Sequence, residues 1–183
     1  MKGRVRTVRR GVNAFDLAVD GAFDHLRGRP VPDRVFYAAS QLGDFGLIWV
    51  ILGTVKGLRK GDDLAAALRM TAAMGIESIL VNGIIKSFFR RTRPPWDIER
   101  PLYVRRPLTS SFPSGHATSA VSAAMMLSED DDWWPVYVTL AAIVATSRIY
   151  VKIHHASDVA GGVAVGLVLG LIGRRLLPAT PAP

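Results

Sequence analysis

The feature that most constrains this chain is a series of apolar blocks of helical length that fills nearly everything after residue 34. Five blocks lie at about 35–56, 64–89, 113–128, 133–151 and 156–176. Single charges interrupt them, but they leave no polar helix faces to cover the outside of a water-soluble core. A membrane-spanning helix needs about 20 mostly apolar residues. The sequence therefore predicts an all-α integral-membrane bundle of about five transmembrane helices.

The first 34 residues have a different character. Residues 1–11 form a basic arm, and apolar residues then recur at helical spacing from Val12 through Phe15, Val19 and Phe23 to Leu26. This segment is too polar to span a membrane, so it is expected to lie on the membrane surface as an amphipathic helix. The expected organisation is an arm and interfacial helix over 1–34, a transmembrane domain over 35–177 and a Pro-rich tail over 178–183.

Composition excludes several classes of function. The chain has no cysteine, which excludes disulfides, zinc bound by thiolates and a cysteine nucleophile. Its net charge of +8 favours a partner with phosphates or an anionic membrane surface. Basic residues do not alternate with aromatic ones as in nucleic-acid-binding segments, so no nucleic-acid partner is expected. Carboxylates do not cluster either, so neither a metal site nor another cofactor is expected.

Polar residues gather at the ends of the apolar blocks, first at the end of the second block. Lys86, Arg90 and Arg93 follow one another at i, i+4 and i+7, which would place them on one face of a helix. Three cations on one face repel each other unless an anion lies among them. Taken alone, such a cluster is typical of the positive residues that flank a membrane span on the cytoplasmic side.

The second cluster is Pro113-Ser114-Gly115-His116, at the start of the third block. Proline, serine and glycine at a helix start leave backbone N–H groups that point along the helix axis toward an anion. Ser114 adds a hydroxyl donor, Gly115 allows close backbone approach, and His116 adds a proton donor. An ordinary capped helix with an incidental histidine would give the same pattern.

The third cluster joins the end of the fourth block to the start of the fifth. Asp158 follows His154 by one helical turn, so its carboxylate can hold the imidazole in one tautomer. Arg148 ends the fourth block and can bind an oxyanion through two N–H groups. A snorkelling arginine beside a hydrogen-bonded loop histidine would be the alternative. Because successive spans are antiparallel, all three clusters are expected on one membrane face.

The three clusters together resemble a known motif. Lys86-x6-Arg93-Pro94, Pro113-Ser114-Gly115-His116 and Ser147-Arg148-x5-His154-x3-Asp158 are similar in order and spacing to the three-part motif of the type 2 phosphatidic acid phosphatase superfamily. The resemblance covers about residues 36–176. Members include membrane lipid phosphatases, undecaprenyl-diphosphate phosphatases, soluble acid phosphatases and vanadium haloperoxidases. Many membrane members have six spans, whereas here a short amphipathic segment replaces the first.

The resemblance implies a metal-independent mechanism through a phosphohistidine. It makes His154 the nucleophile, Asp158 the residue that orients it, and His116 the acid and then the base. Phosphate binding is implied for the following five residues: Lys86, Arg93, Ser114, Gly115 and Arg148. Arg90 and His155 lie outside the motif; Arg90 is expected to have an accessory role in substrate binding, and His155 is expected to be only a neighbour of the nucleophile.

The expected function is therefore a membrane lipid phosphatase acting on a polyprenyl phosphate or diphosphate, a polyprenyl-phosphosugar phosphate or a phosphatidic-acid type lipid. A vanadate-dependent or soluble-substrate relative, and a non-enzymatic protein that binds anionic lipid, are the alternatives. Of the 23 lysines and arginines, all but six are expected on the motif face, and this bias favours a cytoplasmic active site. The six on the opposite face are Lys56, Arg59, Lys60, Arg69, Arg174 and Arg175.

A stripe of small residues has two possible packing partners. Gly162, Gly166 and Gly170 recur every four residues, a spacing that lets helix backbones approach closely within lipid. The stripe could pack within the chain or join two copies in a homo-oligomer.

Overall fold

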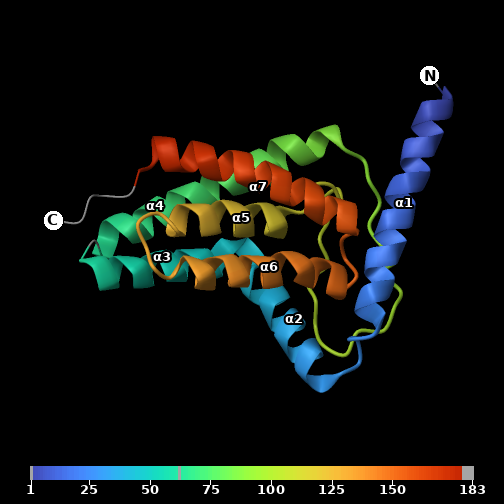
Figure 1. The fold of residues 1–183 in the computed structure, drawn as a ribbon, viewed down its shortest axis with the longest axis horizontal. Coiled ribbons are helices and arrows are strands. Elements are labelled where there is room, and N and C mark those ends of the chain that lie inside the picture. Colours follow the sequence, from blue (N-terminus) through green and yellow to red (C-terminus); the bar gives the residue numbers. More distant parts are fainter. Residues whose placement is uncertain (1, 62, 179–183) are drawn as a thin grey trace.

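The computed structural model describes residues 2–61 and 63–178, and these residues form helices and loops with no strand (Figure 1). The all-α prediction is confirmed. In chain order the elements are α1 (Lys2–Asp24), α2 (Pro30–Leu42), the short helix η1 (Asp44–Gly46), α3 (Leu47–Lys60), α4 (Asp63–Ser78), the π-helical turn η2 (Ile79–Ile84), the 3-10 turn η3 (Ile85–Phe88), α5 (Gly115–Leu127), α6 (Trp134–Tyr150) and α7 (Ala156–Leu176).

The first predicted span, 35–56, is two helices rather than one. α2 and α3 meet at a bend of 66°. At the bend Phe45 and Gly46 both adopt left-handed backbone conformations, with φ of 58° and 69°. A continuous helix cannot contain such residues, so the chain turns where Gly43, Asp44 and Gly46 interrupt the apolar run.

Helix length supports fewer spans than the five expected. Leu64–Phe88 and Ala156–Leu176 are long and apolar enough to cross a membrane, and the bent α2–α3 pair would be a third. α5 has 13 residues and α6 has 17. At 1.5 Å per residue they rise about 20 and about 26 Å, less than the roughly 30 Å of a bilayer core.

Helix α1 also differs from the expectation. It begins at Lys2, so residues 2–11, predicted as an arm, continue the helix without a break. Figure 1 shows α1 crossing one end of the bundle at a steep angle to α5, α6 and α7. Val19 and Phe23 pack against the core, whereas Leu17 is 74% exposed. The predicted Pro-rich tail lies outside the described residues, apart from residue 178.

Helix α5 forms the centre of the bundle. Ala117, Ala120 and Ala123 are fully buried against its neighbours. The glycine stripe of α7 packs on α5 within the chain: a Cβ on Gly162 would lie 2.5 Å from the Ser114 carbonyl oxygen, and one on Gly166 would lie 2.7 Å from that of Thr118. The structure thus gives the stripe a partner inside the chain.

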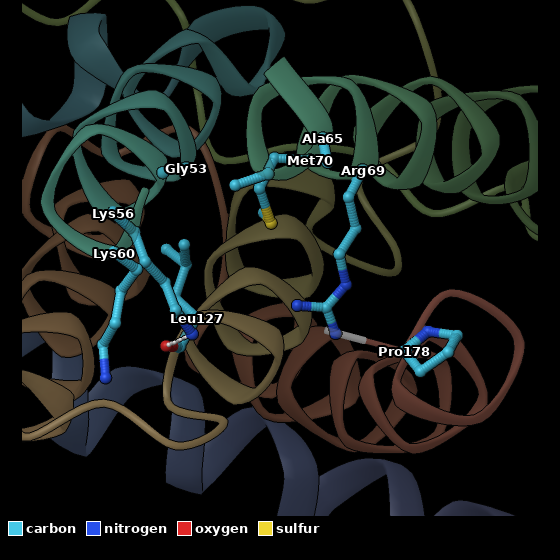
Figure 2. Close-up of a pocket in the computed structure, with 10 residues that line it drawn as sticks. Gly53, Lys56, Lys60, Ala65, Arg69, Met70, Leu127 and Pro178 are labelled. Carbon is cyan, nitrogen blue, oxygen red and sulfur yellow. Dashed lines mark hydrogen bonds between the residues drawn. The ribbon is translucent and has the colours of Figure 1, made fainter. Parts of the chain in front are cut away.

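The bundle end away from α1 is closed by cations that bind the loop after α5. The Lys56 ammonium donates to the Leu127 carbonyl at 2.8 Å (Figure 2). Arg59 pairs with Asp131 at 3.3 Å. Arg69 and Arg174 both pair with Glu129. A small cavity of about 60 Å³ lies between these helices. The cations at this end therefore fix helix ends, and the room for a substrate lies elsewhere.

Candidate active site

A second cavity, at the other end of the bundle, holds most of the predicted residues. It is a cavity of about 510 Å³ between the α2–α3 bend, the end of α4, the start of α5 and the loop before α7. The motif residues among those that line it are Lys86, Arg93, Gly115, His116, Arg148 and His154. Ser114 and Asp158 lie directly behind them, with no exposed surface. The three clusters of the sequence therefore form one site.

His154, which lines this cavity, has one unprotonated ring nitrogen. Its Nε2 lies 3.0 Å from a guanidinium nitrogen of Arg93, and a guanidinium can only donate, so Nε2 is the acceptor. The proton then sits on Nδ1, which faces the Asp158 carboxylate at 3.5 Å. Burial of the ring lowers the pKa of His154 to about 3. The imidazole is therefore neutral near pH 7, with the lone pair of a nucleophile on Nε2.

Asp158 is held as a carboxylate from three directions. Its oxygens accept the Ser111 hydroxyl at 2.5 Å, the His155 backbone N–H at 2.9 Å and the Arg91 guanidinium at 2.7 Å. Four contacts, with His154 as the fourth, leave the carboxylate little freedom to rotate. The geometry fits a residue that orients the nucleophile.

Arg91 is paired in turn by Asp16 of α1 at 2.6 Å, and Asp16 also accepts the Ser157 backbone N–H at 2.7 Å. Sequence reasoning missed Arg91, Asp16 and Ser111. A signal did exist for Asp16, because it shares the apolar face of its helix with Val12 and Val19. A charge on an apolar face needs a partner, and here the partner belongs to the active site.

Most of the residues that were predicted to bind phosphate line the cavity with His154. The Lys86 ammonium donates to Asn82 at 2.9 Å and to Thr109 at 3.3 Å. Arg148 is 3% exposed and donates to Ser40, while its Nε finds no partner among the described residues. Gly115 opens α5, and a Cβ there would lie 3.2 Å from the Asn82 amide oxygen. Buried cations with unused N–H groups can bind the oxygens of a phosphate.

His116 is oriented by the α2–α3 bend. Its Nε2 lies 3.2 Å from the Asp44 carboxylate and 3.1 Å from the Ser40 carbonyl oxygen. Both neighbours are acceptors, so Nε2 carries a proton, as a general acid requires. A Cβ on Gly43 would lie 2.6 Å from the His116 ring, so the glycine permits this approach. In the sequence Asp44 appeared only as an interruption of a span.

Arg90 and His155 lie outside the cavity. The helix that was expected to carry Arg90 ends at Phe88, and Phe89 is extended, so Lys86, Arg90 and Arg93 do not share a helical face. Arg90 is exposed and does not line the cavity. His155 is the N-terminal cap of α7.

Arg93 reaches the site from the loop instead. Its guanidinium donates to the carbonyl oxygens of Ser110 at 3.1 Å and Ile153 at 2.9 Å.

Within the part of the chain that the structure describes, no group of three or more His, Asp or Glu side chains is arranged to hold a metal ion.

Comparison with known proteins gives the same family as the motif. The model of the PAP2 superfamily, the type 2 phosphatidic acid phosphatases, matches residues 66–180. A decaprenylphosphoryl-5-phosphoribose phosphatase of Mycobacterium tuberculosis is 33% identical over 170 residues, which is 89% of each chain.

Two solved structures share the fold. A transmembrane PAP2-type phosphatidylglycerolphosphate phosphatase from Bacillus subtilis superposes with a TM-score of 0.68 at 26% identity, covering 91% of this chain and 86% of that one. LpxE from Aquifex aeolicus superposes with a TM-score of 0.65 at 25% identity, covering 87% of this chain and 94% of that one.

Proposed function

The chain belongs to the PAP2 superfamily and is a membrane lipid phosphatase, and we propose that it removes the terminal phosphate from a polyprenyl-phosphosugar phosphate. The observation that carries this choice is the similarity to a phosphatase of decaprenylphosphoryl-5-phosphoribose over 89% of both chains. Such a substrate has two phosphate groups, one cleaved and one that stays between sugar and lipid.

The proposed reaction has two displacements. His154 Nε2 attacks phosphorus, so an N–P bond forms and the bond to the sugar oxygen breaks, while His116, protonated on both ring nitrogens, gives its Nε2 proton to that oxygen. In the second step His116 takes a proton from water, and the hydroxide displaces His154 to release inorganic phosphate. Asp158 stabilises the charge that develops on His154.

The phosphate oxygens carry the charge of both transition states. Lys86, Arg93 and Arg148 supply positive charge around them, and the Gly115 N–H and the Ser114 hydroxyl complete the proposed set. Four of these groups line the cavity with His154, and Ser114 lies directly behind it. Proximity to the lone pair on His154 Nε2 supports their assignment to the scissile phosphate.

A second pair of cations supports a substrate with a second phosphate. Arg105 and Arg106 line the same cavity but are exposed at its rim. The Arg105 guanidinium lies 4.6 Å from the centre of the Phe45 ring, and that of Arg106 lies 5.4 Å from Trp96. A guanidinium stacked on a ring keeps its N–H edge free for an oxyanion. We assign this pair to the phosphate that is retained.

We further propose a multi-pass arrangement with the active site at the cytoplasmic face and α1 on the membrane surface. The excess of lysine and arginine at the catalytic end supports the orientation. The steep angle of α1 to the bundle (Figure 1), with Phe15 and Leu17 exposed, supports an interfacial position. We accordingly assign residues 1–34 to the membrane surface and residues 35–177 to the membrane domain.

The test is phosphate release by the detergent-purified protein with a chelator present. The lipids offered are a polyprenyl-phosphopentose 5-phosphate, polyprenyl monophosphate, polyprenyl diphosphate and phosphatidic acid. We expect the highest kcat/KM for the first. Faster release from polyprenyl diphosphate would contradict the substrate, and release from none of the four would contradict the function.

The nucleophile is tested in the same assay. His154→Ala should lower kcat by about four orders of magnitude or more, because a nucleophile's loss removes the covalent route. His25→Ala, which changes an exposed histidine outside the site, is the matched control. Full activity of His154→Ala would overturn the assignment.

A further inference from the structure

One buried carboxylate in the catalytic cavity has no part in the proposed chemistry. Glu77, on the last turn of α4, lines the cavity and is 7% exposed. Its Oε1 finds no hydrogen-bond partner among the described residues, and none of their cations lies within ion-pair distance of the side chain. Burial of an unpartnered carboxylate in a membrane helix is costly. A ligand that donates hydrogen bonds to Glu77 offsets this cost.

The neighbours of Glu77 on the cavity wall are small polar groups. Ser78 and Asn82 follow it along the chain, and Ser119 of α5, 5% exposed, adds a hydroxyl. The Asn82 amide donates to the Ser78 hydroxyl at 3.3 Å and accepts from Lys86 at 2.9 Å. This wall therefore offers one carboxylate, one amide and two hydroxyls beside the phosphate-binding lysine.

The helix is distorted where this wall is formed. Glu77 and Lys86 are nine residues apart, about two and a half turns of a regular α-helix, which would place them on opposite faces. The π-helical turn Ile79–Ile84 lies between them, and its wider turn rotates the chain less per residue. Both side chains consequently reach the same cavity.

We propose that Glu77, with Ser78, Asn82 and Ser119, binds the hydroxyl groups of a polyol that carries the scissile phosphate. A carboxylate accepts hydrogen bonds from hydroxyls, whereas it repels a phosphate and gains nothing from a polyprenyl chain. The wall thus fits the part of the headgroup next to the phosphate that Lys86 holds. The inference rests on the proposed function, because these residues recognise the headgroup of the proposed substrate.

The hydroxyls could belong to a sugar or to a glycerol, and the assay distinguishes them. kcat/KM is measured for a polyprenyl-phosphopentose 5-phosphate, for phosphatidylglycerol phosphate and for phosphatidic acid, which has no free headgroup hydroxyl. Glu77→Gln keeps the size of the side chain and removes its charge. We expect it to lower the ratio of kcat/KM for the pentose lipid over phosphatidic acid by about tenfold to a hundredfold, the range for losing hydrogen bonds to a charged group.

Two further variants make the result interpretable. Glu77→Asp keeps the carboxylate and should restore part of the ratio. Thr71→Val changes an exposed residue of the same helix outside the cavity and should leave the ratio as in the wild type. Elution of each variant as the wild-type species in detergent establishes that it is folded.

The outcomes separate the two proposals. A parallel loss with phosphatidylglycerol phosphate would identify a glycerol hydroxyl as sufficient, and a loss confined to the pentose lipid would identify the sugar. Equal losses on all three lipids, or no change in the ratio, would overturn the polyol site while the phosphatase stands. A wild-type protein that releases no phosphate from any lipid would overturn the proposed function itself.

Discussion

At the scale of single residues, the site depends on which nitrogen of each histidine holds a proton. Arg93 donates to Nε2 of His154, so this nitrogen keeps its lone pair. Asp44 and the Ser40 carbonyl accept from Nε2 of His116, so that nitrogen keeps its proton. The two rings are thus prepared for opposite roles before a substrate arrives.

The buried neutral state of His154 predicts a pH dependence of stability. Its pKa is about 3 in the folded protein and 6.5 for an unperturbed histidine. Between these values the unfolded chain binds a proton that the folded protein does not, so the free energy of unfolding decreases as the pH falls from 6.5 toward 3. His154→Gln should remove about 3 kcal/mol of this decrease by about pH 4.5. Thermal unfolding in detergent measures it, and equal losses in wild type and variant would contradict the burial argument.

Residue identity in the motif could be predicted from the sequence, but the contacts between distant segments could not. The order and spacing of Lys86, His116 and His154 were enough to place them together. The apparent helical spacing of Arg90 failed because the helix ends at Phe88. Arg91 and Asp16 lie 75 positions apart in the chain. Their pairing depends on how α1 crosses the bundle, which no local pattern encodes.

At the scale of elements, the position of the phosphate site depends on how closely α7 approaches α5. Gly162 lies against Ser114, the residue that caps α5. The four-residue spacing of the glycines predicted a close approach, and the structure supplies α5 as the partner. The break in the predicted span 35–56 did not follow from hydropathy, because Gly43, Asp44 and Gly46 bend the chain through their backbone conformation.

Gly162→Ala tests this contact. The new Cβ would lie 2.5 Å from the Ser114 carbonyl oxygen, so α5 or α7 must shift. We expect a loss of about 1–3 kcal/mol in stability, typical of overpacking, together with a lower kcat as Ser114 and Gly115 move. Gly75→Ala is the matched control, since its Cβ would meet nothing within 4 Å. If both variants unfold at the wild-type temperature, the close approach does not matter.

At the scale of the whole molecule, the two ends of the bundle use their cations differently. Cations at the catalytic end line a cavity, and those at the other end pair with the loop that holds Glu129 and Asp131. The chain has no cysteine, so single cysteines can report the orientation. Tyr103 at the catalytic end is 74% exposed, and Asp132 at the other end is exposed.

An impermeant maleimide applied to intact cells should label Asp132→Cys and leave Tyr103→Cys unlabelled, because a cytoplasmic active site is shielded by the membrane. Permeabilised cells should show both labelled. Labelling of Tyr103→Cys alone in intact cells would place the active site outside.

The contact between α1 and the active site has a consequence for biosynthesis. Asp16 binds Ser157, which lies 141 positions later in the chain, next to Asp158. Helix α1 can therefore complete its contacts only after α7 has been made, although it also contacts Arg91 and α6. Contacts of such long range form late in assembly. A nascent chain stalled before α7 therefore lacks both Asp158 and the contact that Asp16 makes with Ser157.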